Sequence, residues 1–176
     1  MENKVFIIAG KQGGGKTTYL KKILKSLEKN NIKIGGFIAE GYWKDDKRER
    51  FDLINLKTNK RIIYCQRETK TDWDKVRHFY INPHGQYFGE IAMHPDNLKD
   101  VDIVVIDEVG PFEVENKGWA TAISKLLNDS DIPMIWVVRE SILFEVLEKW
   151  GIEPVGLFHI EEVELSKAVK ELLNYL

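Results

Sequence analysis

The sequence contains little cysteine, with Cys65 alone among 176 residues. A lone thiol cannot form a disulfide within its own chain, so the sequence does not belong to a disulfide-stabilised secreted miniprotein. We interpret Cys65 as a small apolar side chain of the interior. The near absence of cysteine fits a reducing compartment and predicts a cytoplasmic protein.

Long hydrophobic runs are also missing. The first apolar run, residues 5–9, is shorter than the roughly 7–15 apolar residues of a signal-peptide core. No stretch approaches the ~18 apolar residues of a membrane span. We therefore expect neither a secretory signal nor contact with a membrane.

A charge of one sign does not dominate either. The chain has 26 lysine and arginine residues against 28 aspartate and glutamate residues, for a formal net charge of −2. This balance gives no electrostatic reason to expect a nucleic-acid partner. The 43% hydrophobic fraction excludes a disordered chain.

What is present is an alternation of short apolar runs and helical periodicity, which is typical of strand–helix–strand units on a parallel sheet. The expected strands are residues 5–9, 32–39, 102–107 and 133–138. Helical apolar spacing covers residues 20–27, 119–127, 143–150 and 165–176. We predict one α/β domain over residues 1–176, with three layers and a mostly parallel sheet.

Residues 41–100 interrupt this rhythm and predict an insertion. Residues 50–56 and 61–66 flank a polar segment and resemble a β-hairpin. The stretch 69–95 has no clear period, and we expect it to be irregular. We interpret the whole as an insertion on the α/β core that lies over the active site, rather than as a second domain.

A phosphate-binding loop is the strongest motif. Residues 10–17 match G-x-x-x-x-G-K-[ST] between a predicted strand and a predicted helix. Glycines allow the backbone N–H groups to converge on an anion, and the helix N-terminus adds its positive dipole. Lys16 is expected to reach the β and γ phosphates, and the Thr17 hydroxyl to bind Mg²⁺. The predicted nucleotide-binding residues are Gly10, Lys11, Gln12, Gly13, Gly14, Gly15, Lys16, Thr17 and Thr18.

Two acidic residues end the hydrophobic strand at 102–107. Asp107 would hold Mg²⁺ at the carboxyl edge of the sheet, where ligands bind in such folds. Glu108 is placed to polarise a water for attack on the γ phosphorus. The pair is weak evidence alone and strong evidence beside the phosphate loop.

The sequence resembles the small nucleoside-triphosphatases of bacteria, archaea and animals, called cancer-related in their human form. The resemblance covers most of the chain and rests on the phosphate loop, residues 35–40 (GGFIAE), residues 51–53 (FDL) and residues 105–113 (VIDEVGPFE). It implies Mg²⁺-dependent hydrolysis of several nucleoside triphosphates, ATP and GTP among them, with loose base selectivity. Where the family usually has a glycine before its Phe-Asp pair, this chain has Arg50.

The cation that stabilises the transferring phosphate has three candidates. Arg139 follows the strand at 133–138 and would emerge on the ligand-binding edge, so it is our predicted catalytic arginine beside Lys16 and Glu108. Arg48 and Arg50 lie in the basic run of the insertion and stay open as alternatives. Glu40 matches a family glutamate and is a further candidate for the same cleft.

Three functions therefore stand. The first is a Mg²⁺-dependent nucleoside-triphosphatase with water as the acceptor. The second is a kinase that passes the γ phosphate to a small acceptor under the insertion. The third is a nucleotide-gated binding module with an unknown protein partner, which the intact pair Asp107 and Glu108 argues against.

Overall fold

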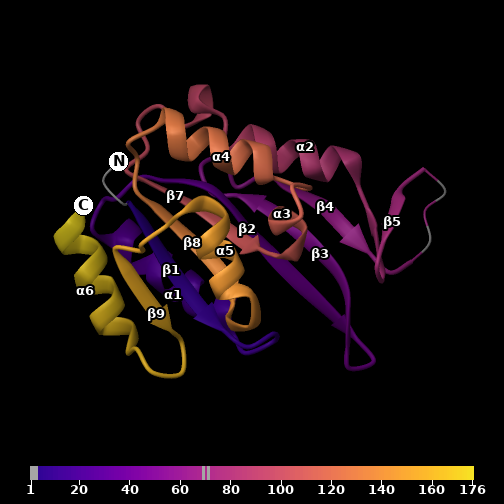
Figure 1. Ribbon diagram of the computed structural model, residues 1–176, viewed down its shortest axis with the longest axis horizontal. Helices are drawn as coiled ribbons and strands as arrows, with labels where there is room; N and C mark the ends of the chain where they lie inside the picture. Colours follow the sequence, from indigo (N-terminus) through magenta and orange to yellow (C-terminus); the bar gives the residue numbers. More distant parts are fainter. Residues whose placement is uncertain (1–3, 69, 71) are drawn as a thin grey trace.

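The computed structural model describes residues 4–68, 70 and 72–176, so Thr69 and Thr71 of the stretch predicted to be irregular lie outside the described residues. The described strands form one nine-stranded sheet in the order β5-β6-β4-β3-β2-β7-β8-β1-β9, with helices on both faces (Figure 1). In chain order the elements are β1 (Val5–Gly10), α1 (Lys16–Lys29), β2 (Ile34–Lys44), β3 (Lys47–Asn55), β4 (Arg61–Gln66), β5 (Asp74–Val76), β6 (Phe79–Ile81), α2 (Pro83–Ala92), η1 (Pro95–Asn97), β7 (Ile103–Val109), α3 (Pro111–Val114), α4 (Ala120–Asp129), β8 (Met134–Arg139), η2 (Glu140–Ile142), α5 (Leu143–Trp150), β9 (Gly156–His159) and α6 (Leu165–Tyr175).

The parallel half of the sheet carries the core. Strand β1 lies between β8 and β9, and β7 lies between β2 and β8, all parallel. Phe6 and Ile8 of β1 pack with the helices α1 and α6, whereas Ile7 and Ala9 belong to the core beneath α4 and α5. Both faces are covered, which is why these strands consist of continuous apolar runs. The α/β fold with three layers is therefore confirmed.

The prediction of a mostly parallel sheet is wrong, because the sheet is mixed. Strands β3, β4, β6 and β5 extend it beyond β2, and every pairing among them and with β2 is antiparallel. The cause is local for three of these pairings, because β2–β3, β3–β4 and β5–β6 are consecutive strands joined by short turns, which require antiparallel pairing. At the β2–β3 turn, Asp45 and Asp46 both take the positive φ that a two-residue hairpin loop favours. We call β3–β6 the extension; it lies at the end of the sheet away from β9 and α6 (Figure 1).

The predicted hairpin at 50–56 and 61–66 is confirmed as β3 and β4. The prediction that residues 69–95 are irregular is wrong, since this stretch contains the short strands β5 and β6 and the ten-residue helix α2. Strand β9 was not predicted at all. None of the helices in the described part of the chain is long and apolar enough to cross a membrane.

One glycine permits a close contact between two core strands. Gly36 of β2 has φ +83°, and a Cβ there would lie 2.0 Å from the carbonyl oxygen of Val105 on β7. Any side chain would therefore push β2 away from β7 in addition to straining the backbone.

We predict that Gly36→Ala destabilises the protein by about 3 kcal/mol or more, because strain and a backbone clash act together. Urea unfolding with linear extrapolation measures the loss. Gly151→Ala is the matched control: its φ is +59° but nothing lies within 4 Å of the new Cβ, so it should cost only about 1 kcal/mol. Equal losses in the two variants would contradict this account of Gly36.

Candidate active site

The loop between β1 and α1 has the geometry of an anion nest. Gly13 and Gly15 have φ values of +73° and +95°, and the Gly14 amide donates to the Lys11 carbonyl at 3.0 Å. Alternating left-handed and right-handed residues turn successive N–H groups to one side of the chain. The loop is solvent-exposed from Lys11 to Gly15, so this concavity is accessible to a ligand.

The first turn of α1 adds to the same site. Gly15 is its N-cap, and within the described residues no side chain caps the helix and its first turn carries no acidic residue. The unpaired N–H groups and the positive dipole end are therefore available to an anion. Thr18 lies exposed in that turn.

Lys16 is held inside the loop. Its side chain is buried, and its Nζ donates to the Lys11 carbonyl at 2.8 Å. Burial lowers the pKa of Lys16, and the Glu108 and Asp107 carboxylates oppose that shift. The oxygens of a bound phosphate would therefore replace the water that the ammonium group of Lys16 loses on burial.

Asp107 is fully buried at the end of β7. Its Oδ2 accepts from the Thr17 hydroxyl at 3.1 Å and from the Ala39 amide at 3.0 Å. Burial, and after it the Glu108 carboxylate, raises the pKa of Asp107 to about 7. Its Oδ1 has no hydrogen-bond partner among the described residues.

This arrangement fits a hard divalent cation. A hydroxyl and a carboxylate lie side by side, with one buried carboxylate oxygen still unpartnered, and oxygen donors are what Mg²⁺ prefers. Within the described chain no cluster of three or more histidine, cysteine, aspartate or glutamate side chains could enclose a metal. Mg²⁺ usually completes its shell with water and substrate phosphates, so two protein ligands suffice.

Glu108 has a strained backbone, with φ +66° in a residue that carries a Cβ. Its carboxylate lies 3.4 Å from Nη2 of Arg139. Arg139 ends β8, where it is in register with Gly10 of the phosphate loop, and its Nη1 donates to the Gln12 side chain at 3.5 Å. Strain of about 1–3 kcal/mol at such a position is typical of functional sites.

The arginines of β3 go to opposite faces of the sheet. Arg48 is paired with Trp43 and Arg50 with Tyr42, and the β3 strand has one extra residue, Glu49, between them. Residues two apart normally share a face, but a bulge inverts this relation. Each guanidinium stacks on the ring of its own partner, at 4.3 Å for Arg48 and 4.4 Å for Arg50.

Arg48 faces the phosphate loop and Arg50 does not. The Arg48 guanidinium acts electrostatically on Lys16, and Glu108 and Asp107 act on it. No ion pair is recorded for it within the described residues, and Gly41 leaves it space, since a Cβ there would lie 1.9 Å from its Nη1. Arg50 instead pairs with Asp52 at 2.9 Å.

Glu40 lies on the face of Arg50, apart from the phosphate loop. Its carboxylate pairs with Lys21 and with Arg61, and it accepts from the Tyr42 hydroxyl at 3.0 Å. These partners, Lys21 first, lower the pKa of Glu40 to about 2. The structure gives Glu40 a role in fixing α1 against the sheet rather than a place in the cleft.

A cavity of about 750 Å³ opens beside the loop, between the extension and the segment after β7. Its phosphate end is lined by Gln12, Arg48, Glu108 and Arg139. Cys65 also lines it, and burial raises the pKa of that thiol to about 12, so the thiol is an unreactive wall group.

Glu113 belongs to the motif at residues 105–113 that carries the family resemblance, but no role was predicted for it from the sequence. Its side chain is buried, accepts from the Gly110 and Trp119 amides at 2.9 and 3.3 Å, and holds the segment that follows Glu108. Burial raises the pKa of Glu113 to about 7. A helix-start signal could have indicated this role, because Pro111 begins α3 and an acid follows two residues later.

Comparison with known proteins agrees with this geometry. A family model described as NTPase matches residues 5–173. The chain is 29% identical to the nucleoside-triphosphatase THEP1 of Methanocaldococcus jannaschii, over 95% of this chain and 94% of that protein. It is 31% identical to the nucleoside-triphosphatase THEP1 of Methanosarcina acetivorans, over 76% and 75%.

Two solved structures share the fold. The solution structure of a human cancer-related nucleoside triphosphatase superposes with a TM-score of 0.71 at 15% identity, covering 99% of this chain and 97% of that one. The crystal structure of THEP1 from Aquifex aeolicus gives a TM-score of 0.71 at 18% identity, covering 98% of each chain.

We predict that Glu40→Gln lowers stability at pH 7 and flattens the loss of stability in acid. The folded pKa of Glu40 lies below its unfolded value, so its contribution is present above about pH 4.5 and is lost as pH falls towards 2. Urea unfolding at pH 7, 4 and 3 measures this, with Glu28→Gln, an exposed carboxylate of α1, as the control. Parallel acid limbs in the wild type and Glu40→Gln would contradict the prediction.

Proposed function

Because the chain belongs to the NTPase family and is a nucleoside-triphosphatase, we propose that it hydrolyses several nucleoside triphosphates, ATP and GTP among them, to diphosphate and phosphate in a Mg²⁺-dependent reaction. The observation that carries this proposal is the hydrogen bond between Thr17 and Asp107. It joins the phosphate loop to the acidic strand end, which together form the minimal cation and triphosphate site of this chemistry.

The nucleotide-binding residues are residues 10–18, with Lys16 on the terminal phosphates. Thr17 and Asp107 would hold the cation, and a Mg²⁺ ion bound there neutralises charge on the phosphate oxygens. The lowered pKa of Lys16 and the raised pKa of Asp107 both report burial of charges that a bound polyanion and cation would compensate.

Glu108 is the residue we assign to the attacking water. A general base must lie within hydrogen-bond reach of the proton it accepts, and Glu108 lines the cavity at its phosphate end. Arg139 pairs with it at 3.4 Å, which holds the carboxylate in place and brings a cation beside the phosphate loop. The positive φ of Glu108 coincides with an irregularity of the β7–β8 register between Ile106 and Val109. Such a bulge redirects a side chain and is often found beside active sites, which supports this role.

We also propose loose base selectivity, which the resemblance to the family implies. Ile160, just after β9, lies against Gly10 and Gly14. A base that lay beside this aliphatic side chain would find no hydrogen bond there that distinguishes bases. The free, buried Cys65 supports a reducing, cytoplasmic setting.

The experiment is phosphate release from ATP, GTP, CTP and UTP separately, with Mg²⁺ and with EDTA. We expect release from several nucleotides and none in EDTA. Release from one nucleotide alone would overturn loose selectivity, and release that persists in EDTA would overturn the metal requirement.

Glu108→Gln should lower kcat by about 10²-fold or more while leaving nucleotide affinity within a few-fold, because only the proton acceptor is lost. Single-turnover hydrolysis and binding of a non-hydrolysable ATP analogue measure the two quantities. Glu145→Gln, an exposed carboxylate of α5, is the control. Unchanged hydrolysis in Glu108→Gln would remove the residue from the mechanism.

Arg48→Gln should lower kcat by about 10²-fold, since a cation at the developing phosphate charge is lost. Arg50→Gln is its matched control, two residues away on the other face of the sheet, and should change kcat less than about threefold. Steady-state kcat and KM, with Arg139→Gln measured in parallel, decide which arginine acts. Equal effects of Arg48→Gln and Arg50→Gln would refute the argument from the bulge.

A further inference from the structure

The cavity beside the phosphate loop is larger than the reaction with water requires. Its volume of about 750 Å³ lies within the ~300–1,000 Å³ range of small-molecule pockets. Among the residues of the phosphate loop, all of which the structure describes, Gln12 alone lines it. The cavity therefore extends away from the triphosphate site, from the terminal-phosphate side towards the extension.

Aromatic side chains form part of the wall of the cavity. Six aromatic residues contribute from β2, β3, β4, β6 and the segment around α3: Trp43, Phe51, Tyr64, Phe79, Phe112 and Trp119. Trp119 packs against Tyr64, and Arg48 lies over the Trp43 ring, so a planar ligand would contact the ring surface that these side chains leave accessible. Stacking on such a surface contributes about 1–3 kcal/mol for each base in nucleic-acid complexes. A water molecule gains no stacking interaction from such a surface.

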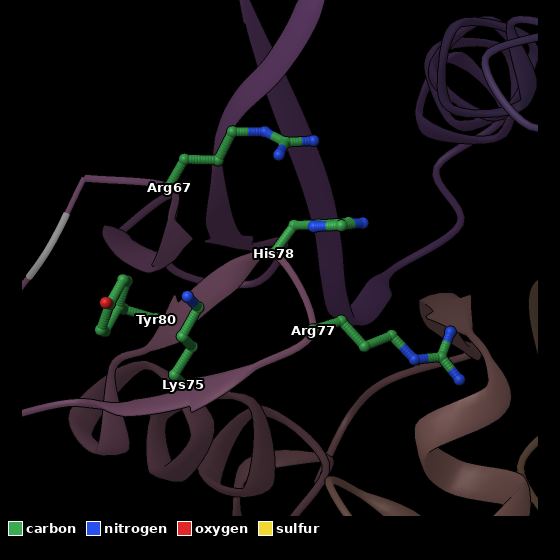
Figure 2. A pocket seen from close by; sticks show the side chains of 5 residues that line it. All are labelled: Arg67, Lys75, Arg77, His78 and Tyr80. Carbon is green, nitrogen blue, oxygen red and sulfur yellow. The ribbon is translucent and has the colours of Figure 1, made fainter.

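The distal end of the cavity is cationic. A smaller pocket of about 290 Å³ is lined by Arg67, Lys75, Arg77, His78 and Tyr80, and it shares Arg67, Arg77 and His78 with the larger cavity. In Figure 2, these three side chains extend in the same direction, away from the β5–β6 hairpin. Among the described residues no carboxylate lines this smaller pocket, and the nearest acidic partner of its arginines is Glu115, 3.7 Å from Arg77. Two guanidinium groups at one end of a cavity are suited to a phosphate. Nε of Arg67 already donates to the Arg48 carbonyl at 2.6 Å, so the terminal nitrogens of Arg67 are the ones that would contact it.

Arg77 is an unexpected residue for its position. It is the first residue of the two-residue turn between β5 and β6 and has φ +53°. Glycine, asparagine or aspartate satisfies such a turn with less strain. Its side chain is exposed and makes one long ion pair, 3.7 Å to Glu115 across the cavity mouth. The turn alone does not explain an arginine here, whereas an anionic ligand does.

We propose that this cavity binds a second small ligand, a phosphate monoester of a planar ring system such as a nucleoside monophosphate, with its phosphate on Arg67 and Arg77 and its ring among the aromatic side chains. The proposal rests on the proposed function only in that the near end of the cavity is the terminal-phosphate site. The two ligands would then lie side by side, the triphosphate in the loop and the monophosphate across the extension.

The test measures binding and needs no hydrolysis. AMP, GMP, CMP and UMP are titrated calorimetrically into the wild-type protein with Mg²⁺ and a saturating non-hydrolysable ATP analogue, which occupies the phosphate loop. We expect at least one monophosphate to bind with the analogue in place. Failure of all four to bind, or their displacement by the analogue, overturns the proposal. Neither result depends on whether the triphosphate is hydrolysed, so the two proposals fail separately.

Arg77→Gly provides the sharp variant, because glycine adopts φ +53° more easily than arginine and the fold is not put at risk. The monophosphate dissociation constant should rise at least tenfold, with a thermal midpoint no lower than that of the wild type by more than about 2 °C. Arg61→Gln is the matched control: Arg61 begins β4 of the same extension but pairs with Glu40 and does not line the cavity.

Equal affinity in the wild type and Arg77→Gly overturns the proposal. So does tight binding of a single-stranded oligonucleotide without any binding of monophosphates, which would make the cationic end a nucleic-acid surface.

Discussion

A buried carboxylate organises the active-site edge of this sheet. Asp107 is fully inaccessible to solvent, and a single oxygen accepts both the Thr17 hydroxyl and the Ala39 amide. A buried charge is tolerated only when partners replace the lost water. Here the partners come from α1 and β2, so the same requirement fixes the phosphate loop and the strand that leads into the extension. The unpartnered oxygen and the raised pKa of Asp107 leave part of that requirement to a bound cation.

Most of the parallel half could be predicted from the sequence, because strands covered on both faces must be continuous apolar runs. Strands β5 and β6 have three residues each, too few for an alternation to be visible. Helix α2 was hidden by Gly85 and Gly89, residues that disfavour helices. They are there because α2 packs closely: a Cβ would lie 2.8 Å from Ile63 or 2.5 Å from Trp119. The Asn82 cap followed by Pro83 was a start signal that could have revealed it.

The candidate site, too, could be predicted only in part from the sequence. Lys16, Thr17 and Asp107 were found from local motifs, since a phosphate loop requires particular residues at fixed spacing. Arg48 could not be separated from Arg50, because the bulge that sends them to opposite faces depends on pairing with β2, which no local pattern records. The cationic end of the cavity was missed for a similar reason: β4 and the β5–β6 turn bring its residues together only when the strands pair.

The balance of charge explains how one edge of the sheet can serve a triphosphate. Three cations, Lys16, Arg48 and Arg139, lie near the carboxylates of Asp107 and Glu108. The other four side chains all act electrostatically on Lys16. Three cations against two carboxylates leave a surplus that suits a polyanion and not a neutral ligand. The carboxylates also oppose the effect of burial, which lowers the pKa of Lys16. Because the five side chains come from α1, β3, β7 and β8, phosphate binding and the pairing of the extension with the core depend on each other: an extension that loses its pairing with β2 also withdraws Arg48 from the phosphate.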